Sequence, residues 1–592
     1  MVNYNLAKIL REISVLLEIR GVGFKPQAYE KAAHSVEMLE QDVREIYKDG
    51  GIKALEEIPG VGKGIAQRIE EYLKTHRIDD HDKLKKQIPV QIDELASVEG
   101  IGPKMILRLY QKLGIKTRAQ LEKAAQTGKL RDIEGFGQKT EENILRSIGF
   151  LKKEHGRFIL GFVMPQAKVI LEKIRNLAEV KSAEYAGSLR RRQETVGDLD
   201  FIVFSDKPET VIKKFLDFSE IKHIYSKGKH KALVRLHTDI DADMSVVSPK
   251  SLGSALIAWT GGKDHNIALR TLAEKKGWLL NDHGLWDGNP STIAPLGLSS
   301  GRKQGKRKLL ASKTEEEVYK KLGMDWIPSE IRNGTDEIIA ALEGKLPNLI
   351  GYNDLKGDLQ VQTDWTDGDH SIKEMAEAAK KLGLEYICIT DHTKSLAMTG
   401  GNDEKGLLKE MAEIDKVQKQ VSGIKILKGA EVNIMKDGSL DIDDETLVKL
   451  DVVGAAVHSH FNLSEKDQTE RIIRAMENLN VDIIFHPTGR IIQRRDAYKV
   501  DMDALLKAAK RTKTVMEIDA YPDRSDLKDE YIRKAVDPPT GGGVKLAIDS
   551  DAHSIHHLQY LEYGIAQARR GWAERKDIIN ARSWQDMLKL LK

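Results

Sequence analysis

Residues 353–592 alternate between short apolar runs and helical patterns, and this alternation constrains the fold more than any other feature of the chain. The runs are LQVQT, EYICIT, IKILKGAEVNI, LDVVGAAV, DIIF, TVMEIDA and VKLAIDS. Apolar strands separated by helices are typical of a parallel sheet, because each helix carries the chain back across one face of the sheet. We therefore predict an open parallel sheet or a barrel for this part of the chain.

Ionisable side chains stand where these predicted strands end. Six consecutive strand ends carry Asp391 and His392, Glu431, His458 and His460, His486, Asp519, and Asp551 and His553. A mixture of imidazole and carboxylate at the carboxyl ends of strands suits Zn²⁺ or Mn²⁺ in a multinuclear phosphoesterase. A single strand-end His is more often structural, so the repetition carries the prediction. The first strand departs from it, because it offers two neutral amides, Gln360 and Gln362, on one side.

Length and composition indicate a large multidomain protein. At 592 residues the chain is long enough for three to five domains, and its 40% apolar and 31% charged residues are ordinary for a globular protein. No apolar run approaches the roughly 18 residues of a membrane-spanning helix, and the first 21 residues have the pattern of an amphipathic helix instead of a signal peptide. The single cysteine, Cys388, excludes an internal disulfide bond and a cysteine zinc site. We expect a cytoplasmic protein with no membrane contact.

The net charge of +3 is unevenly spread along the chain. Residues 1–350 hold 58 Lys and Arg against 49 Asp and Glu, a net charge of +9, whereas residues 351–592 hold 36 against 42, a net charge of −6. The basic part is therefore the part expected to meet a polyanion, although lysines usually only solvate a surface. The basic run GRKQGKRKLL (301–310) is either a DNA contact or a solvated loop.

Residues 1–150 are predicted to be helical, with three similar glycine turns. The turns lie in LEEIPGVGKGIAQRIEEYL (55–73), LASVEGIGPKMILRLYQKL (95–113) and LRDIEGFGQKTEENILRSI (130–148). The glycines allow a tight backbone, and the helix after each turn presents unpaired N–H groups that suit a phosphate. One such turn would be only a helix cap. Three copies predict helix-hairpin-helix elements that hold a DNA backbone without reading its sequence.

The strongest chemical signal lies in GDLDFIVF (197–204) and DIDADMSVV (239–247). Asp198 and Asp200 lie two apart on one face of a predicted strand, and the second segment offers Asp239, Asp241 and Asp243 in the same phase. Carboxylates from two strands suit Mg²⁺, and two such ions activate an attacking hydroxyl and neutralise a departing pyrophosphate. An isolated Asp-x-Asp is usually a solvated strand end.

A second segment, GSLRRR (187–192), precedes the first aspartates by ten residues. It would place backbone N–H groups, a hydroxyl and guanidinium groups beside a triphosphate. The combination of this segment with aspartates on two strands predicts nucleotidyl transfer.

These motifs resemble those of the family X DNA polymerases, in the bacterial and archaeal form with a C-terminal PHP (polymerase and histidinol phosphatase) domain. The resemblance covers nearly the whole chain and includes QAYEKAA (27–33), two of the glycine turns, GSLRRR…VGDLDFIV and WTGGKDHNIALR (259–270). It implies a multidomain α and α/β protein with a helical helix-hairpin-helix N-terminal region, a nucleotidyltransferase-type α/β palm and a C-terminal PHP (β/α) barrel. The expected domains are a helical DNA-binding domain with the first hairpin (1–85), a helical domain with the second hairpin (86–150), the palm (151–250), a nucleotide-selecting domain (251–327), a linker (328–352) and the PHP domain (353–592).

The resemblance also implies the roles of individual residues. The catalytic ligands of Mg²⁺ or Mn²⁺ would be Asp198, Asp200 and Asp243, with Asp241 as the less favoured third ligand. The expected nucleotide-binding residues are Gly187, Ser188, Arg191, Gly197, Trp259, Gly261, Asn266 and Arg270. The expected DNA-binding residues are Gly60, Gly62, Gly64, Gly100, Gly102 and Lys104. The expected PHP ligands of Zn²⁺ or Mn²⁺ are Asp367, His392, Glu431, His458, His486, Asp551 and His553.

The PHP pattern of the family begins with His-x-His, where this chain has Gln360 and Gln362. A neutral amide oxygen is a poor zinc ligand, so at least one metal position should be weak or empty, while the amides can hydrogen-bond across the barrel. We predict a PHP domain that is impaired as a 3′-5′ exonuclease or phosphoesterase and keeps a structural or DNA-positioning role. A site that uses two metals at a reduced rate is the alternative.

Two further positions depart from the family pattern. Relatives that excise a 5′-deoxyribose phosphate use a lysine amine where this chain has Arg68, and a guanidinium stays protonated and cannot form the Schiff base. Lys63 lies five residues earlier, so the sequence argues against lyase activity. Several relatives place a tyrosine at the position of Ala258, where the backbone helps to reject ribonucleotides. We expect weak sugar discrimination.

The sequence therefore predicts a template-directed DNA polymerase that fills short gaps during DNA repair. Its expected partners are gapped or nicked double-stranded DNA and dNTPs, and we expect a monomer. Three alternatives stay open: a PHP exonuclease or 3′-end-processing enzyme whose polymerase is secondary, a DNA-binding scaffold without catalysis, and a template-independent nucleotidyltransferase.

Overall fold

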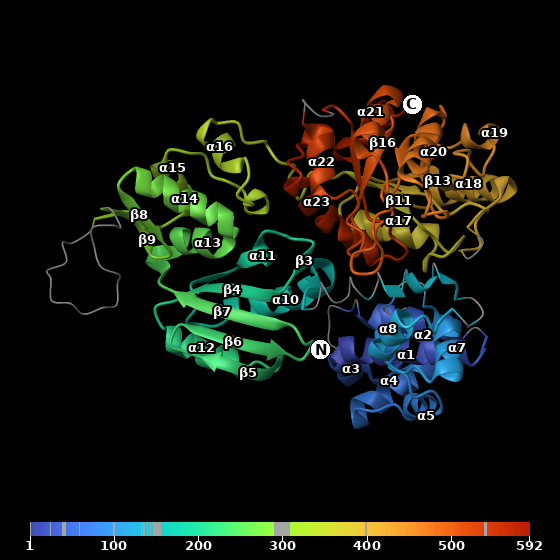
Figure 1. Ribbon diagram of the computed structural model, residues 1–592, viewed down its shortest axis with the longest axis horizontal. Coiled ribbons are helices and arrows are strands. Elements are labelled where there is room, and N and C mark those ends of the chain that lie inside the picture. The colour runs from blue at the N-terminus through green and yellow to red at the C-terminus, as the bar shows by residue number, and fades with distance from the viewer. Residues whose placement is uncertain are drawn as a thin grey trace. The chain divides into compact units, whose positions relative to one another are not determined.

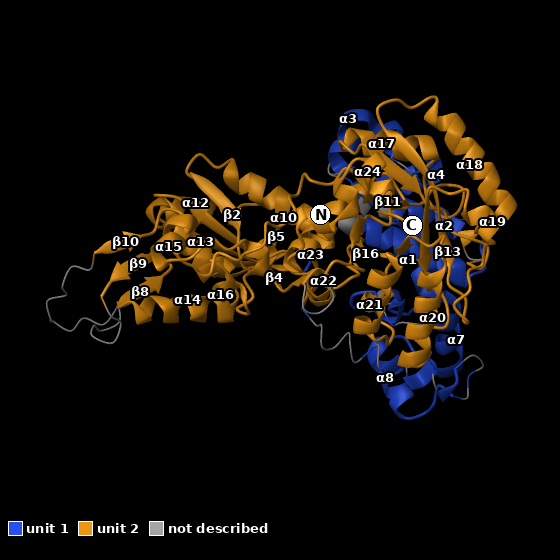
Figure 2. Ribbon diagram, turned by 90° about the horizontal axis from the view of Figure 1, so that it is seen from above, with its two compact units in different colours: residues 1–156, 237–239, 491–496 blue, residues 157–236, 240–490, 497–592 orange. Residues whose placement is uncertain are grey.

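The computed structural model describes residues 2–592 apart from 24, 38, 40–42, 59, 97, 99–100, 132, 134–135, 139, 143, 146–147, 149–155, 289–307, 397–398 and 538–541. The chain forms two compact units, coloured separately in Figure 2. The first comprises residues 1–156, 237–239 and 491–496, and the second comprises residues 157–236, 240–490 and 497–592. Among the helices of the described residues, none combines the length and the apolar character that a membrane crossing requires.

The first unit is helical (Figure 1). Its helices are α1 (Val2–Ile19), α2 (Lys25–Glu37), α3 (Val43–Glu56), α4 (Lys63–Thr75), α5 (Asp79–Gln87), α6 (Ile92–Ala96), α7 (Pro103–Leu113) and α8 (Arg118–Gln126). Leu6, Leu10 and Ile13 recur every three or four residues along α1, which places them on one face, and they are buried in the core of this unit. The helical prediction for the front of the chain is therefore confirmed.

The expected palm, in the second unit, contains a five-stranded sheet in the order β2-β4-β7-β6-β5. Its strands are β2 (Ser182–Tyr185), β4 (Asp198–Phe204), β5 (Ile221–Lys227), β6 (Lys231–Leu236) and β7 (Asp241–Val247), and its helices are α10 (Leu160–Arg175), α11 (Gly187–Arg190) and α12 (Pro208–Leu216). Strands β4, β7, β6 and β5 of this sheet are labelled in Figure 1, and β2 is labelled in Figure 2. A separate antiparallel pair joins β1 (Phe158–Ile159) to β3 (Thr195–Val196). Only β4 and β7 pair in parallel in the five-stranded sheet, and they carry the predicted aspartates.

A smaller region follows the palm. It consists of α13 (Leu252–Thr260), α14 (Lys263–Lys275), a three-stranded antiparallel sheet and α15 (Glu315–Leu322). The strands of that sheet are β8 (Trp278–Asn281), β9 (Gly284–Asp287) and β10 (Leu309–Ala311). Within the expected linker, the chain forms the 3-10 helix η3 (Ser329–Ile331) and α16 (Glu337–Leu342), and Ile331 and Ala341 lie in the core of this region.

Glu315, the first residue of α15, ties this region to the palm. Arg190 of α11 donates to both oxygens of Glu315 at 2.8 Å, and Arg332 donates to Oε1 at 2.7 Å. Burial by itself raises the pKa of Glu315, but Arg332 and Arg190 together lower it to about 2. Arg332 is fully buried, so this carboxylate stabilises a guanidinium that lies out of contact with water.

The C-terminal part is a barrel of seven parallel strands in sequence order. The strands are β11 (Gly357–Val361), β12 (Tyr386–Ile389), β13 (Lys425–Asn433), β14 (Val452–Ala456), β15 (Ile483–Ile484), β16 (Val515–Asp519) and β17 (Leu546–Asp549). The helices are α17 (Ile372–Lys381), α18 (Glu404–Gln418), α19 (Asp444–Leu447), α20 (Glu465–Glu477), α21 (Met502–Thr512), α22 (Asp529–Val536), α23 (Leu561–Arg570) and α24 (Trp584–Leu588). A parallel bridge from Val361 to Ala552 brings the first and last strands together, so the ring is nearly closed. The parallel fold that the alternation predicts is confirmed.

Side chains alternate between the two faces of this barrel. Along β12, Tyr386 and Cys388 belong to an inner cluster, whereas Ile387 and Ile389 pack against the surrounding helices. Gly454 of β14 lies against Phe485 of that inner cluster, and a Cβ at Gly454 would lie 1.9 Å from the Phe485 ring. Glycine is therefore required at this position, because the inner face has no room for another carbon atom.

We expect Glu315→Gln to lower the free energy of unfolding by about 3–5 kcal/mol, because it removes the carboxylate between two guanidinium groups. Glu316→Gln changes an exposed neighbour and is the matched control, for which we expect less than about 0.5 kcal/mol. Urea denaturation followed by circular dichroism measures both values.

The stabilisation by Glu315 depends on pH in a defined direction. The pKa of Glu315 in the folded protein lies below its ordinary value, so the stabilisation is fully present above about pH 4.5 and is lost as the pH falls toward about 2. The difference between wild type and Glu315→Gln should therefore shrink between pH 7 and pH 3. An equal difference at both pH values would contradict the assignment.

Candidate functional site

Three predicted aspartates lie together on two neighbouring strands of the palm. β4 carries Asp198 and Asp200, β7 carries Asp243, and the parallel register pairs Asp200 with Asp243. Residues two apart share one face of a strand, so the three carboxylates lie on the same face of the sheet. Asp239 does not join them, because it precedes β7 in a turn with a φ of 61°, and the expectation that it continues the same strand phase is wrong.

The carboxylates repel one another in a partly buried site. Burial, followed by the charges of Asp198 and Asp243, raises the pKa of Asp200 to about 7. Burial and the neighbouring aspartates also raise the pKa of Asp198. Oδ1 of Asp243 is buried and has no hydrogen-bond partner among the described residues. A divalent cation would relieve both the repulsion and the unpaired oxygen, so this set of donors fits Mg²⁺ or Mn²⁺.

Two cations on the adjacent strand β6 separate the roles of Asp241 and Asp243. Arg235 donates to both oxygens of Asp241. Lys231 Nζ lies 2.6 Å from Oδ2 of Asp243 and 5.2 Å from the centre of the Trp259 ring. Asp241 is thus held by a two-pronged contact, whereas Asp243 keeps one oxygen for another partner. The sequence reasoning missed Lys231 and Arg235, although their alternation in KALVRL placed both on one face.

Gly187 begins the turn that the sequence assigned to a triphosphate. Its φ is 54°, and a Cβ at this position would lie 1.8 Å from Oδ2 of Asp200. Glycine therefore allows α11 to lie directly against the aspartates. Ser188 is the next residue of α11, and Gly197 lies between β3 and Asp198 at the other end of the same connection. Gly187 thus lies against Asp200, and Ser188 and Gly197 are the chain neighbours of Gly187 and Asp198.

The first two arginines of this segment have different contacts. Arg190 points away to Glu315 and to Oγ1 of Thr260. Arg191 donates from Nη1 to the carbonyl of Thr260, and burial lowers its pKa, whereas the charge of Asp200 opposes that shift. Arg191 is therefore an arginine whose pKa responds to the charge of Asp200.

The predicted residues of 259–270 lie on α13, α14 and the turn between them. Trp259 is the penultimate residue of α13, and Gly261 ends that helix. Asn266 Nδ2 donates to the carbonyl of Ala258 at 2.8 Å, and a Cβ at Gly261 would lie 2.8 Å from Asn266 Oδ1. Arg270 lies one turn further along α14, and its side chain is exposed.

The predicted DNA-binding glycines lie in the first unit. α4 and α7 begin directly after Gly62 and Gly102, and no side chain of the described residues caps the N-terminus of either helix. Gly60 has a φ of 75°, Gly64 lies in the first turn of α4, and Lys104 is exposed in the first turn of α7. Gly100, parts of the third glycine turn and residues 301–307 of the basic run lie outside the described residues. Arg68 forms an ion pair with Asp80.

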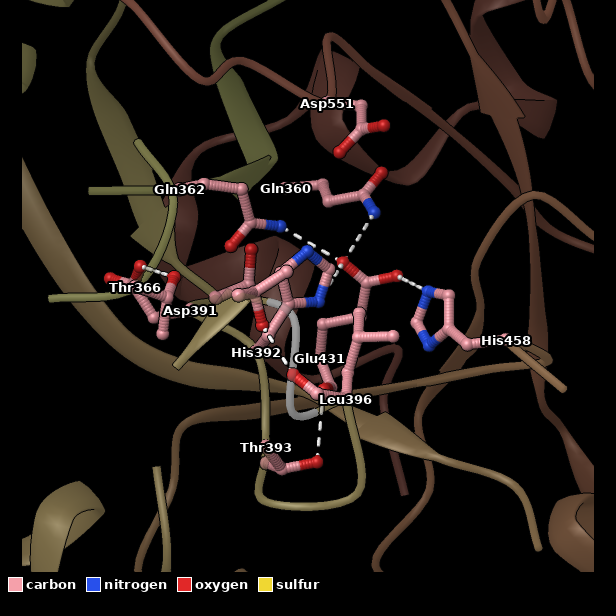
Figure 3. A network of polar contacts seen from close by, with 12 residues as sticks. Gln360, Gln362, Thr366, Asp391, His392, Thr393, Leu396, Glu431, His458 and Asp551 are labelled. Atoms are coloured by element: carbon pink, nitrogen blue, oxygen red, sulfur yellow. Dashed lines mark hydrogen bonds and ion pairs between the residues drawn. The ribbon is translucent and has the colours of Figure 1, made fainter. Parts of the chain in front are cut away.

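The barrel centre is organised around one carboxylate, Glu431 of β13 (Figure 3). His486 Nε2 lies 2.8 Å and His458 Nε2 lies 3.0 Å from Oε1 of Glu431, and His392 Nδ1 lies 3.4 Å from Oε2. Burial by itself raises the pKa of Glu431, but the imidazoles, first His392 and then His458, hold it well below its usual range. Three of the strand-end histidines thus converge on one fully buried carboxylate.

Gln360 and Gln362 of the first strand region direct their amide nitrogens to this same carboxylate (Figure 3). Gln360 Nε2 donates to Oε2 of Glu431 at 3.2 Å, and Gln362 Nε2 donates to it at 2.9 Å. Both side chains are fully buried, and neither amide oxygen has a hydrogen-bond partner among the described residues. The amides therefore satisfy Glu431 as hydrogen-bond donors, which a pair of metal-bound imidazoles would not do.

Two overlapping groups of side chains keep the arrangement of a metal site. One consists of Asp367, His392 and His553, and the other consists of His392, Glu431 and His458. In each group, one ligand atom from every residue lies within 4.8 Å of the others. Imidazole with carboxylate fits Zn²⁺ or Mn²⁺, so these residues suit a metal without the two glutamines.

Asp551 contacts a cation that the sequence reasoning missed. Arg524 Nε lies 3.5 Å from Asp551 and 3.4 Å from Asp519. Burial by itself lowers the pKa of Arg524, but the charges of Asp551 and Asp519 raise that pKa above its ordinary value. His460 is exposed, and Asp391 accepts hydrogen bonds from Thr363 and Thr366, so these two strand-end residues do not take part in either group.

Comparison with known proteins gives matches along nearly the whole chain. A helix-hairpin-helix domain matches residues 1–78, a SAM-like helix-hairpin-helix tandem matches 92–149, the thumb of DNA polymerase beta matches 255–333, and a PHP domain matches 358–521. The DNA polymerase/3′-5′ exonuclease PolX of Bacillus subtilis (strain 168) is 36% identical over 591 residues, which are 99% of this chain and 99% of that protein. DNA polymerase lambda of Arabidopsis thaliana is 25% identical over 360 residues, 56% of this chain and 62% of the relative. A probable phosphatase of Thermoanaerobacter sp. (strain X514) is 36% identical over 189 residues, 31% of this chain and 72% of the relative.

Proposed function

This chain belongs to the family X DNA polymerases that carry a C-terminal PHP domain, and we propose that it fills short gaps in DNA during repair by adding nucleotides from dNTPs to a primer 3′-hydroxyl. The observation that carries this proposal is the juxtaposition of Asp198, Asp200 and Asp243 with the Gly187 turn. A DNA-binding scaffold without catalysis would not require three partly buried carboxylates that repel one another. The monomeric state and the cytoplasmic location stay predictions from the sequence.

The three palm aspartates would hold Mg²⁺ or Mn²⁺, which supplies activation of the primer hydroxyl and neutralisation of the departing pyrophosphate. Asp243 is the third ligand in this proposal, because Arg235 occupies both oxygens of Asp241. Lys231 balances the charge of Asp243 and packs on Trp259, so it orients one wall of the nucleotide site.

The turn at α11 would bind the triphosphate of the incoming nucleotide. Ser188 supplies a hydroxyl, and Arg191 supplies a guanidinium with five N–H donors, of which the described hydrogen bond to Thr260 uses one. Trp259 and Gly261 would lie under the sugar. Asn266 and Arg270 would face the minor groove of the new pair and the template, and the carboxamide of Asn266 is held by the Ala258 carbonyl.

The first unit would hold the phosphate backbone of gapped or nicked DNA. α4 and α7 begin after Gly62 and Gly102 without a side-chain cap among the described residues, so backbone N–H groups in the first turn of each helix would be available to a phosphate, although the first residue of α7, Pro103, has no N–H. Gly60, Gly64 and Lys104 would support these contacts. Gly100 is included in this proposal on sequence grounds alone.

The PHP domain would be impaired as a 3′-5′ exonuclease. Two features support this proposal: Gln360 and Gln362 replace imidazoles, and both point N–H groups toward Glu431. Asp367, His392, Glu431, His458 and His553, with His486 and Asp551 nearby, would hold Zn²⁺ or Mn²⁺, which supplies the nucleophile of phosphoester hydrolysis. The name of the Bacillus subtilis relative includes 3′-5′ exonuclease activity, so a PHP nuclease is the second candidate function.

We expect the wild type to extend a 5′-labelled primer on gapped DNA according to the template. The variant Asp198→Ala/Asp200→Ala should reduce the rate of extension by about 10³-fold or more, because the bound cations would lose two carboxylate ligands. Asp206→Ala removes an exposed aspartate just beyond β4 and is the matched control, for which we expect wild-type extension. Gel electrophoresis with Mg²⁺ or Mn²⁺ measures both reactions. Extension without a template would favour a template-independent nucleotidyltransferase.

Without dNTPs, the wild-type protein should leave the primer unshortened. The variant Gln360→His/Gln362→His should shorten the primer with Mn²⁺ at a rate at least about tenfold above any shortening by the wild type, because two imidazoles return to the proposed metal site. Metal content, measured by mass spectrometry on the full chain, should rise in the same variant. Gln418→His, on α18 and outside the site, is the control. Rapid shortening by the wild type would show that the impairment proposal is wrong and that the PHP nuclease works with glutamines.

Ala258→Tyr should raise the preference for dCTP over CTP by about tenfold, the scale of discrimination that one steric contact provides. The physical reason is that Ala258 keeps its carbonyl in place through Asn266 but has no ring to extend over the sugar. Single-nucleotide gap filling with each substrate measures the ratio. A wild-type ratio as high as that of a strict DNA polymerase would contradict weak sugar discrimination.

A further inference from the structure

One helix of the PHP barrel, α23, presents a row of side chains to the polymerase part of the same compact unit. Glu562 pairs with Lys168 of α10 at 2.7 Å, and Arg569 donates to Glu330 of η3 at 2.7 Å. The opposite face of α23 packs on the barrel, where a Cβ at Gly564 would lie 2.6 Å from Ile548 of β17. α23 therefore connects the wall of the barrel to the palm and to the region after it.

The centre of this contact is Glu194, a palm residue enclosed by PHP side chains. Arg490 donates from Nη2 to Oε1 of Glu194 at 2.6 Å and from Nη1 to Oε2 at 3.3 Å. Gln567 of α23 donates to the same Oε1 at 2.8 Å, and Arg570 Nη2 lies 3.7 Å from it. Arg490 and Glu194 are largely buried, with 13% and 16% of their side-chain surfaces exposed. A two-pronged guanidinium contact of this kind fixes the direction of the carboxylate as well as its charge.

Glu194 lies in the connection between the proposed triphosphate turn and the catalytic strand. It follows Ser188 by six residues and precedes Asp198 by four. Its carbonyl accepts from Leu160 N at 2.9 Å, and Gln193 N donates to the carbonyl of Ser188 at 3.1 Å. A displacement of Glu194 would therefore be transmitted along a short hydrogen-bonded segment to both ends.

A second PHP contact holds the same segment at Arg192. Arg570 Nη1 donates to the carbonyl of Arg192 at 3.1 Å, and Asp529 of α22 orients the other nitrogens of Arg570. Arg192 has a φ of 53°, a left-handed conformation that a residue with a side chain adopts only when its surroundings impose it. The PHP domain thus holds the turn at two positions, Arg192 and Glu194, which follow Ser188 by four and six residues.

We propose that Arg490, Gln567 and Arg570 are positioning residues of the polymerase, which hold the turn 191–194 so that Ser188 and Arg191 meet the triphosphate of the incoming nucleotide. This inference rests on the proposed function of that turn. It assigns the PHP domain a role in nucleotide binding that requires none of its metal ligands. An error of about 1 Å in the position of such a group costs a polymerase up to about 10²-fold in rate or binding.

Steady-state filling of a one-nucleotide gap by the full chain tests the proposal. Arg490→Ala and Glu194→Gln should each raise KM for the dNTP by about tenfold or more, with a smaller change in kcat and an unchanged Kd for DNA. The double variant should be no worse than the more affected single variant, because both changes remove one contact. Lys168→Ala breaks an exposed ion pair of the same interface and should leave KM within twofold of wild type.

Milder variants keep the test decisive if Arg490→Ala does not fold. Arg490→Lys keeps the charge without the two-pronged contact and should give an intermediate KM, and Gln567→Glu places a like charge beside Glu194 and should raise KM. Circular dichroism checks that each variant is folded. Values of KM within twofold of wild type for all folded variants would overturn the inference. Absence of extension by the wild type would instead overturn the proposed function, so the two failures are distinguishable.

Discussion

Buried carboxylates that require a positive partner determine how this chain is organised. A carboxylate out of contact with water is stable only when cations or hydrogen-bond donors surround it. Glu315 has two arginines, Glu194 has arginines and an amide from another domain, and Glu431 has three imidazoles and two amides. Each of these carboxylates joins elements that are far apart in the sequence.

The palm site differs from these structural carboxylates because its charges are left incompletely paired. Asp198 and Asp200 lie side by side on β4 with Asp243 opposite, and their repulsion raises the pKa of Asp200 to about 7. Lys231 contacts one oxygen of Asp243, while the other has no hydrogen-bond partner among the described residues. A site that is only partly neutralised by its own side chains is the type of site that attracts a divalent cation, whereas the fully paired Glu315 is not.

The barrel centre lies between these two cases. Its histidines and Asp367 keep the spacing of metal ligands, but the amides of Gln360 and Gln362 already donate to the central carboxylate. The barrel also holds the palm through α23 and Arg490, which lies only four residues after His486. A domain with such contacts has a reason to keep its fold even with Gln360 and Gln362 at the positions where the family pattern has imidazoles, because the loss of the barrel would release Glu194.

Much of this architecture could be predicted from local patterns. Alternation of apolar runs with helices indicated the parallel sheet, and the pair Asp198 and Asp200 indicated a metal-binding face, because strand and helix periodicities are local properties of the chain. Expecting Asp239 on the same strand was wrong, because the strand begins two residues later, and strand ends are set by tertiary pairing. Neither Lys231 nor Arg524 carried a recognisable motif, since a lysine or arginine gains a specific role only from the carboxylate that folding places beside it.

The sequence by itself determined the succession of helical, palm-type and barrel elements and the residue types available at each strand end. Only the tertiary structure decided which charges face one another: Arg190 turns to Glu315 while Arg191 stays near Asp200, and Gln360 and Gln362 donate to Glu431. It also placed Arg490 and Gln567 of α23 against Glu194, from which they lie 296 and 373 positions away in the sequence. Periodicity follows from the geometry of a single segment, whereas charge pairing depends on distances between segments that are fixed only when the chain has folded.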